Sequence, residues 1–573
     1  MTNLFDPSLG AAAQAAPVPV VPAATLFTGL GDDAWRDASK ALSLDYDVVV
    51  PGLARPFHPW QAAAYVYAND SIARWGGVII GDDMGLGKTA VILALAADAV
   101  RTTGRPAIIV APPVVEGGYI NELRACFPHL SLQVVKGHKR RPLDPADIYL
   151  LSDDSRTMQT WLTDVITNPQ TGKRQHHASA WVQGASLVAQ DEIHRSKGNG
   201  GKPTGRARAM LAVGEWCRSV GTPIVGATGT LLSNRPVEGY LPLQIVGGER
   251  IIKAITPGAH SITGYLWRYC APTQGTARGG RKFTSFGGID TTVALTLHDH
   301  LRRTLYVRRE KSDLGEGVLP HSGWVVAPMA LPDGTMRRYA RVEHDFFNLC
   351  VEERGAVWAD KVSRAQAVVQ MGMLREEAGV AKAEAAADYI ADLVIEEGKQ
   401  VVAFYDHRRV WEKLALALLG KGVTVTTING QVTGDDRIEA VEEFQRGDAQ
   451  VVLAQIKAAG IGVTLTAAAD AVFVQCGWAA GDLKQCADRI LRADDISRAR
   501  AAAGERVTWH VLQAHYADGD ATFDAHIWDV LEKKAAVCDA VNAGRPVTMD
   551  EDSVQKEALL TWQPSQRHYK GGW

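Results

Sequence analysis

The chain has 573 residues, 46% of them hydrophobic and 22% charged, and a formal net charge of −3. This length predicts more than one domain, and the balanced charge excludes a protein that coats nucleic acid with its whole surface. A local basic groove is still compatible with it. Seven cysteines without a C-x-x-C pair favour reduced thiols over a zinc ribbon. The sequence has no signal-peptide pattern and no apolar run of ~18 residues, so we expect a cytoplasmic protein without membrane spans.

The N-terminal part of the sequence divides into an arm and a first α/β unit. Residues 1–50 include an Ala/Pro-rich stretch at 11–25, which predicts a flexible arm. From residue 51 onward, short apolar runs alternate with helical stretches, a pattern typical of strands buried in a parallel sheet. We predict a unit over 51–250, with strands at 78–80, 107–111, 148–151, 186–189 and 224–226 and a helix at 89–100.

The same alternation returns after residue 398. Residues 251–398 are rich in Arg, Glu and Ala and predict helical insertions that connect two units, at 292–307, 334–353 and 361–395, with a glycine-rich loop at 275–288. The second unit, over 399–520, has predicted strands at 400–405, 423–428, 450–455, 471–475 and 507–512 and helices at 409–419 and 436–444. Residues 521–573 predict a C-terminal helix and tail. The fold class is therefore α/β, with two doubly wound units.

A glycine-rich stretch, GDDMGLGKTA at 81–90, nearly fits the phosphate-binding pattern G-x-x-x-x-G-K-[ST], but Asp82 stands where the strict pattern has glycine. Gly85 and Gly87 permit a tight turn around phosphates at the start of a helix. Lys88 would reach the β- and γ-phosphates, and Thr89 would ligate Mg²⁺. The loop alone leaves a chance match open.

Two later motifs supply the rest of an ATP-hydrolysing site. LVAQDEIHRSK (187–197) ends a predicted strand in Asp191-Glu192, where the first carboxylate can hold Mg²⁺ and the second can position water. QCADRILR (485–492) places Arg489 and Arg492 on one helix face. In a two-lobed ATPase they would be the arginine fingers that stabilise transition-state charge.

These motifs, in this order, resemble the superfamily two helicase-like ATPases, and most closely the SWI/SNF-type double-stranded-DNA translocases. The first motif of that family is typically DEMGLGKT, so aspartate at position 82 is its usual residue and only Asp83 departs, conservatively. The resemblance covers roughly residues 50–515. It implies two tandem RecA-like lobes, with ATP and Mg²⁺ as cofactors and DNA as a partner.

The resemblance also implies the site residues. Besides the phosphate loop, the resemblance assigns two further motifs to the ATP site, RPFHPWQ (55–61) and AAGIGVTLTAA (458–468). The ATP-binding residues that it implies are Gln61, Asp83, Met84, Gly85, Leu86, Gly87, Lys88, Thr89 and Gly460. For DNA, AIIVAPPVVEGGYINEL (107–123), ATGTLLSNRPVE (227–238) and the second-lobe motif predict Pro112, Pro113, Thr228, Asn234 and Thr464. After Arg492 the family usually continues with isoleucine or tryptophan, glycine and glutamine. Here Ala493-Asp494-Asp495 follows instead, and any contact from those positions is in question.

Further stretches resemble the annealing-helicase, fork-remodelling branch: LWRYC (266–270), RRTLYVRREKSDLGEGVLP (302–320) and MGMLREEAGVAKAEAAADYI (371–390). Basic clusters at 136–141, 202–208, 302–311 (with Arg308 and Arg309) and 337–341 are candidate phosphate contacts, which would give binding without sequence preference.

The function that the resemblance implies is a DNA-dependent ATPase. It would move along or remodel duplex or forked DNA in replication, recombination or repair, associated with the nucleoid if the protein is bacterial or from a phage. A strand-separating DNA or RNA helicase and a non-hydrolysing DNA-binding scaffold with a relic motor remain open.

Overall fold

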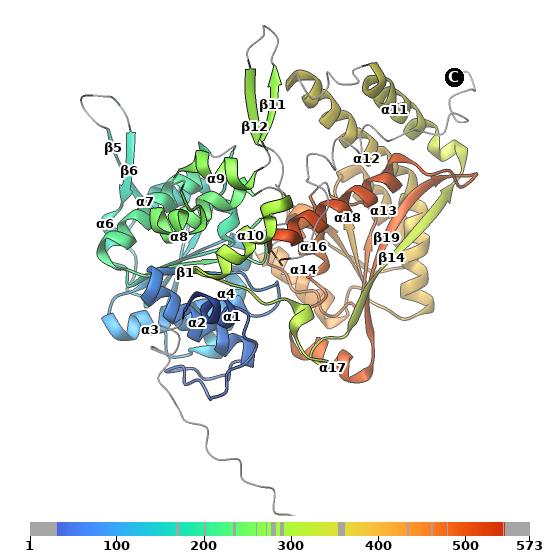
Figure 1. The fold of residues 1–573 in the computed structure, drawn as a ribbon. Coiled ribbons are helices and arrows are strands. Elements are labelled where there is room, and N and C mark those ends of the chain that lie inside the picture. Colours follow the sequence, from blue (N-terminus) through green and yellow to red (C-terminus); the bar gives the residue numbers. More distant parts are fainter. Residues whose placement is uncertain are drawn as a thin grey trace, which may run out of the picture.

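The structure is a computed structural model that describes residues 31–542 and 544, except 168–169, 171, 173, 200–201, 233–235, 259–260, 271, 277–281, 287–290, 353–360, 433–434, 460–461 and 478. It consists of two α/β lobes side by side (Figure 1). None of the described helices is long and apolar enough to cross a membrane.

The first lobe is built on seven parallel strands in the order β13-β1-β10-β7-β2-β4-β3. Most of these strands are short and apolar, because both faces of the sheet are covered by helices. Alternate residues of one strand therefore enter different cores, with Val78 and Ile80 in one and Ile79 in the other. The strands are β1 (Gly77–Ile80), β2 (Ala107–Ala111), β3 (Leu132–Val135), β4 (Ile148–Ser152), β7 (Leu187–Asp191), β10 (Ile224–Ala227) and β13 (Tyr306–Val307).

Two groups of helices cover the two faces of this sheet. One core is shared with α1 (Asp32–Ala38), α2 (Pro59–Trp75), α3 (Lys88–Thr103) and α4 (Glu116–Cys126). The other core is shared with α5 (Ser155–Leu162), α6 (Ala180–Gln183), α7 (Gly205–Val220), α8 (Val237–Ile255), α9 (Ile262–Tyr269) and α10 (Thr291–Arg302). Short 3-10 turns follow three of the strands, at η1 (Pro113–Val115), η2 (Ile193–Ser196) and η3 (Lys311–Asp313).

The second lobe has six parallel strands in the order β14-β19-β18-β15-β17-β16. They are β14 (His321–Leu331), β15 (Val401–Tyr405), β16 (Val425–Ile428), β17 (Val451–Gln455), β18 (Asp470–Phe473) and β19 (Arg506–Tyr516). The helices are α11 (Asp333–Glu352), α12 (Lys361–Ala391, continued by a π-helical turn, η4, at Asp392–Glu396), α13 (Arg408–Gly420), α14 (Asp435–Arg446), α15 (Ile456–Ala459), α16 (Ala480–Ala487), α17 (Asp495–Ala503) and α18 (Phe523–Asn542). The predicted class of two doubly wound lobes is thus confirmed.

Helix α18 bridges the lobes. Trp528 belongs to the core of the second lobe, whereas Val530 belongs to a core of the first. At its end, the Asn542 side chain donates to the carbonyl of Leu232 at 2.9 Å and accepts from the N–H of Leu232 at 3.3 Å. Figure 1 shows this helix beside α10 and α16.

Four stretches differ from the sequence-based expectations. Within the predicted arm over 1–50, Asp32–Ala38 form α1, and its Trp35 is buried in a core of the first lobe. Residues 292–307 are not one helix, because α10 ends at Arg302 and Tyr306-Val307 pair with Ile79-Ile80 as β13. The glycine-rich segment 275–288 contributes to a hairpin of β11 (Pro272–Thr276) and β12 (Lys282–Phe286). Strand β14 lies within the predicted helical connection, yet it pairs with the full length of β19, so the second sheet begins earlier than residue 399.

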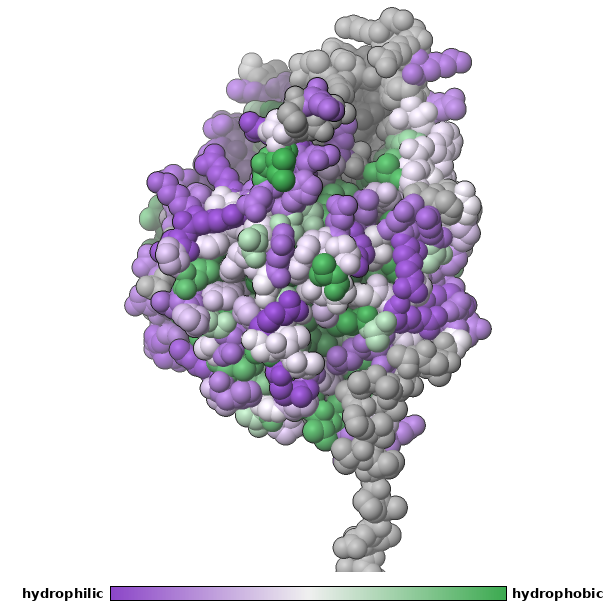
Figure 2. Space-filling model, turned by 90° about the vertical axis from the view of Figure 1, so that its left-hand side faces the viewer, coloured by the Kyte–Doolittle hydropathy of each residue, from purple (hydrophilic) through white to green (hydrophobic). Residues whose placement is uncertain are grey.

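Two further hairpins belong to the first lobe, β5 (Thr163–Thr167) with β6 (Arg174–Ala178) and β8 (Gly198–Asn199) with β9 (Lys202–Pro203). Figure 2 views the molecule from the first-lobe side, where hydrophilic side chains dominate and hydrophobic ones are scattered. This is the pattern of a solvated face rather than of an apolar docking patch.

Candidate functional site: the cleft between the lobes

The phosphate loop connects β1 to α3 as the sequence predicts. Gly85 and Gly87 have φ of +85° and +84°, which glycine adopts without strain. A Cβ at Gly87 would clash with the amide of Gln61, so a side chain there would displace Gln61. Among the described residues no side chain caps α3, and its first N–H groups are open to an anion. Lys88 Nζ donates to the carbonyls of Asp82 (2.7 Å) and Asp83 (3.2 Å).

The acidic pair lies beside this loop, at the carboxyl end of β7. Asp191 Oδ1 accepts from the N–H of Glu192 at 2.9 Å, and Asp191 Oδ2 accepts from the hydroxyl of Tyr119 at 3.1 Å. Glu192 has φ +51°, the one positive φ outside glycine in the described part of the chain. A left-handed glutamate is a strained conformation that tends to occur at functional sites. The strand end therefore holds the two carboxylates in fixed and different directions.

The environments of the two carboxylates differ. Burial, together with the adjacent Glu192 charge, raises the pKa of Asp191 above its ordinary value. Burial raises the pKa of Glu192 as well, but His194, whose Nδ1 lies 3.1 Å from Oε2 of Glu192, and the charge of Lys88 lower it, and the net shift is downward. The pKa values of the two neighbouring carboxylates are therefore shifted in opposite directions.

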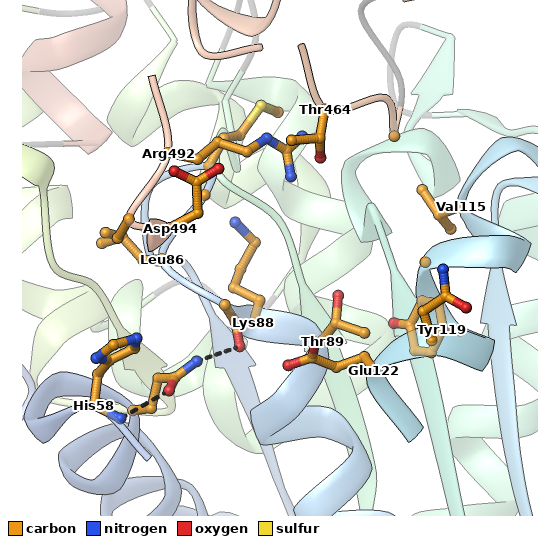
Figure 3. Close-up of a pocket in the computed structure, with 18 of the residues that line it drawn as sticks. His58, Leu86, Lys88, Thr89, Val115, Tyr119, Glu122, Thr464, Arg492 and Asp494 are labelled. Carbon is orange, nitrogen blue, oxygen red and sulfur yellow. Dashed lines mark hydrogen bonds between the residues drawn. The ribbon is translucent and has the colours of Figure 1, made fainter. Parts of the chain in front are cut away.

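Arginines from the second lobe form the opposite wall of the cleft. The cleft encloses about 660 Å³, and Lys88, Thr89 and Glu192 on one side face Arg489 and Arg492 on the other. Figure 3 shows Lys88 and Arg492 reaching into the same space. Burial lowers the pKa of both guanidiniums, and that of Arg492 is lowered further by the charge of Arg489. An anion between the walls would relieve this repulsion.

The two lobes also touch through backbone at this point. The N–H of Ala493 donates to the carbonyl of Gly85 at 3.2 Å, and a Cβ on Gly85 would lie 3.0 Å from the Cα of Arg492. Arg492 donates to the carbonyl of Val463 at 2.9 Å. The backbone contact between Ala493 and Gly85 thus sets the distance between the phosphate loop and the segment that carries Arg492.

At the far end of the cleft, Gln61 does not present a free amide. Its Oε1 accepts from the N–H of His58 at 2.9 Å, and its Nε2 donates to the carbonyl of Gly87 at 3.3 Å (dashed in Figure 3). The ring of His58 stacks on Trp60 with centroids 4.5 Å apart, and Arg498 of the second lobe lies 3.2 Å from the His58 Nε2. In this structure Gln61 therefore supports the phosphate loop at the wall of the cleft.

The two aspartates of the loop have a structural partner that the sequence did not reveal. Arg309 donates to both oxygens of Asp82 at 3.0 Å, and Arg308 donates to Asp83 at 2.9 Å. Arg308 also donates to the carbonyl of Gly81. All four side chains are buried. Asp82 therefore stands where a strict phosphate loop has glycine, and its carboxylate forms a bidentate ion pair with Arg309.

This arrangement corrects three predictions. Arg308 and Arg309 were expected to contact DNA, but they are 1% and 0% exposed and are satisfied inside the first lobe. Asp83 was expected at the nucleotide, but its carboxylate is bound by Arg308 and by the N–H of Lys311 at 3.2 Å. Buried, paired charges cannot reach a ligand without losing their partners.

The remaining residues that were predicted to contact DNA differ in their exposure. Thr228 is fully buried, and its hydroxyl lies 2.8 Å from Nδ1 of His194, so it connects two motifs rather than facing DNA. Pro112 is buried, whereas Pro113 is exposed at the start of η1. Thr464 lines the cleft beside Arg492. The expectations for Asn234 and Gly460 fall outside the described residues.

The other predicted residues line the cleft: Met84, Gly85, Leu86, Gly87, Lys88, Thr89, Asp191, Glu192, Arg489 and Arg492. The two arginines do not share a helix face as predicted, because α16 ends at Ala487 and they lie in the turn that follows it. Sequence reasoning missed Tyr119, whose hydroxyl donates to Asp191, and His194, whose Nδ1 lies 3.1 Å from Glu192. The only signal for His194 was its place three residues after Asp191, and Tyr119 had none.

Comparison with known proteins agrees with this geometry. The family described as helicase conserved C-terminal domain matches residues 382–494. The human DNA annealing helicase and endonuclease ZRANB3 is 24% identical over 514 residues, which cover 87% of this chain and 41% of that protein. The SWI/SNF-related matrix-associated actin-dependent regulator of chromatin subfamily A-like protein 1 of Xenopus tropicalis is 24% identical over 473 residues, covering 82% and 43%. The chain thus spans less than half the length of these curated relatives.

Among solved structures, the Sulfolobus solfataricus SWI2/SNF2 ATPase core in complex with dsDNA covers 87% of this chain and 95% of its own, at 16% identity and a TM-score of 0.34. That superposition is too distant to add to the sequence matches. Those matches cover 82–87% of the chain and therefore extend into both lobes. Over most of its own length the chain is therefore similar to a DNA annealing helicase and to a SWI/SNF-related regulator of chromatin.

Proposed function

We propose that the protein is a DNA-dependent ATPase that uses ATP hydrolysis to move along or remodel duplex or forked DNA. The observation that carries the proposal is the cleft. It brings a phosphate loop, an acidic pair and two buried arginines from separate lobes around one space. The curated relative named as a DNA annealing helicase favours DNA as the substrate.

The residues of the cleft fit ATP with Mg²⁺. Thr89 and Asp191 offer the hard oxygen ligands that Mg²⁺ prefers, and a bound Mg²⁺ would neutralise charge on the phosphates. In the described residues no group of three or more His, Cys, Asp or Glu could hold a metal ion by itself. Two protein oxygens completed by phosphate and water are the usual arrangement for Mg²⁺ in such sites.

The chain's own groups then have distinct tasks. Lys88 and the N–H groups at the start of α3 bind the phosphates. Glu192, which lies 3.1 Å from Nδ1 of His194, orients the attacking water and takes its proton. Arg489 and Arg492 stabilise the charge that develops during transfer, an effect of order 10³–10⁵ in rate where arginine fingers have been measured. Because these groups belong to different lobes, hydrolysis is tied to closure of the cleft.

The test is an ATPase assay over a panel of duplex, single-stranded and forked DNA and of RNA. We expect DNA to stimulate hydrolysis, with duplex or forked DNA more effective than single strands, and we expect Lys88→Ala and Glu192→Gln to abolish it. Arg489→Ala should bind ATP but lose turnover. Stimulation by RNA or by single strands alone would favour the strand-separating alternative. Wild-type protein without activity on any of these would favour the scaffold.

A further inference from the structure

One lysine between the lobes contacts the chain beside both finger arginines. Lys311 Nζ donates to Oδ1 of Asp488 at 2.5 Å and to the carbonyl of Leu491 at 2.6 Å. Asp488 directly precedes Arg489, and Leu491 directly precedes Arg492. A single ammonium therefore fixes the turn that follows α16 at two points, each one residue before a finger.

The other end of Lys311 is attached to the phosphate loop. Its backbone N–H donates to Oδ2 of Asp83 at 3.2 Å, and the N–H of Asp83 in turn donates to the carbonyl of Arg309 at 2.9 Å. Lys311 follows β13, which pairs with β1 directly before the loop. One residue thus spans the distance from the loop to the fingers. Lys484 of α16 approaches the same Asp83 at 3.4 Å.

The burial of this contact argues for a positional role. The side chains of Lys311 and Asp488 are 11% and 10% exposed. A buried ion pair pays for its desolvation and is often no more stabilising than an apolar pair of the same size. What it adds is a defined geometry, since the ammonium must meet its acceptors at hydrogen-bond distance. The Lys311 contact is therefore better suited to setting a position than to stabilising the fold.

We propose that Lys311 is a positioning residue that sets Arg489 and Arg492 in register with the phosphate loop. The inference rests on the proposed ATPase function and adds to it the element that aligns the two lobes. Arginine fingers act only at the correct distance, and a displacement of ~1 Å can cost on the order of 100-fold in rate. The effect should therefore appear in turnover and not in ATP binding.

The experiment compares Lys311→Met, which keeps the apolar stem and removes the ammonium, with Asp488→Asn and with the double variant. We expect kcat for DNA-stimulated hydrolysis to fall roughly 10- to 100-fold in Lys311→Met and no further in the double variant, because the Lys311–Asp488 contact is already absent. Asp488→Asn keeps the bond from Lys311 to the carbonyl of Leu491 and should lose less. The affinity for a fluorescent ATP analogue should change less than about threefold. Lys311→Arg, which keeps the charge, should recover part of kcat.

The matched control is Lys253→Met, which removes an exposed lysine paired with Glu249 on α8 and should leave kcat unchanged. Wild-type kcat in Lys311→Met would overturn the inference, as would additive losses or an equal loss of ATP affinity. Arg489→Ala distinguishes failure of this inference from failure of the proposed function. If it loses turnover while Lys311→Met does not, only this inference fails, and if wild-type protein does not hydrolyse ATP, the proposed function fails. Should Lys311→Met not fold, Asp488→Asn and Lys311→Arg carry the same comparison.

Discussion

Replacing Asp82 by glycine would make the phosphate loop match the strict G-x-x-x-x-G-K-[ST] pattern, yet we expect it to destabilise the protein. Arg309 is fully buried and donates to both oxygens of Asp82 at 3.0 Å, with one further bond, at 3.1 Å, to the carbonyl of Ala41. Asp82→Gly leaves this guanidinium without its counter-charge. Removing one partner of a buried ion pair costs about 3–5 kcal/mol.

That free energy corresponds to a lowering of the first thermal transition by roughly 6–20 °C, since 1 kcal/mol shifts Tm by about 2–4 °C in a unit of 150–250 residues. The assay is a thermal unfolding scan of Asp82→Gly beside Asp448→Gly. Asp448 is an exposed aspartate paired with Arg446, and its replacement reports the cost of a new glycine together with the loss of an exposed ion pair, about 0.5–2 kcal/mol in all. The Asp82→Leu/Arg309→Met double variant should recover most of the loss, because an apolar pair can replace a buried ion pair.

An Asp82→Gly protein that unfolds at the wild-type temperature and hydrolyses ATP at the wild-type rate would refute the reasoning. It would mean that Arg309 finds another partner or reaches water. Loss of stability that the double variant does not recover would instead point to the carboxylate itself, through its bond to the backbone N–H of Arg309 at 2.9 Å.

Three further predictions follow from single contacts. Tyr119→Phe removes the hydroxyl that holds Asp191, and should raise the Mg²⁺ concentration needed for half-maximal ATPase activity about three- to tenfold, which a Mg²⁺ titration measures. Asn542→Ala removes both hydrogen bonds from α18 to the first lobe and should expose the C-terminal helix to limited proteolysis, with a cost of about 1–3 kcal/mol. Burial, and then the charge of Arg498, lower the pKa of His58. The stability that its neutral form contributes is therefore present above the unfolded pKa near 6.5 and is lost as pH falls through the lowered value. Unfolding scans at pH 7.5 and 5.5 should show a smaller loss of stability at the lower pH in His58→Gln than in wild type.

Much of the fold could be predicted because buried parallel strands are continuous apolar runs. The strands at 107–111 and 148–152 are fully or almost fully buried and fall within one residue of their predicted bounds. Strand β14 was not predicted because its sequence is not a continuous apolar run of buried residues. It is an edge strand with exposed Val325 and Val326 and with Pro328 in its length, and it belongs to a sheet whose other strands lie far along the chain.

The cleft residues were predictable where chemistry fixes the residue type, as with Lys88, Thr89 and the acidic pair. The basic cluster at 302–311 was not, because a run of arginines has the same appearance whether it meets DNA phosphates or buried carboxylates. The distinction depends on the β1–β13 pairing, which brings Arg308 and Arg309 to the two aspartates from 225 or more residues away. Partners that distant leave no pattern in a single sequence.

The departure at Ala493-Asp494-Asp495 can now be interpreted physically. Ala493 contacts the phosphate loop through its backbone N–H, a bond that any residue except proline can make. Asp494 accepts from the N–H of Ser497 at 2.9 Å and so caps α17, for which aspartate is among the preferred residues. The altered triplet thus preserves the contact between lobes and begins the next helix, while its second carboxylate lines the cleft with Arg498. The side chains that differ from the family pattern lie at the end of the cleft near His58, whereas the contact between Ala493 and Gly85 next to the finger arginines is made by backbone atoms.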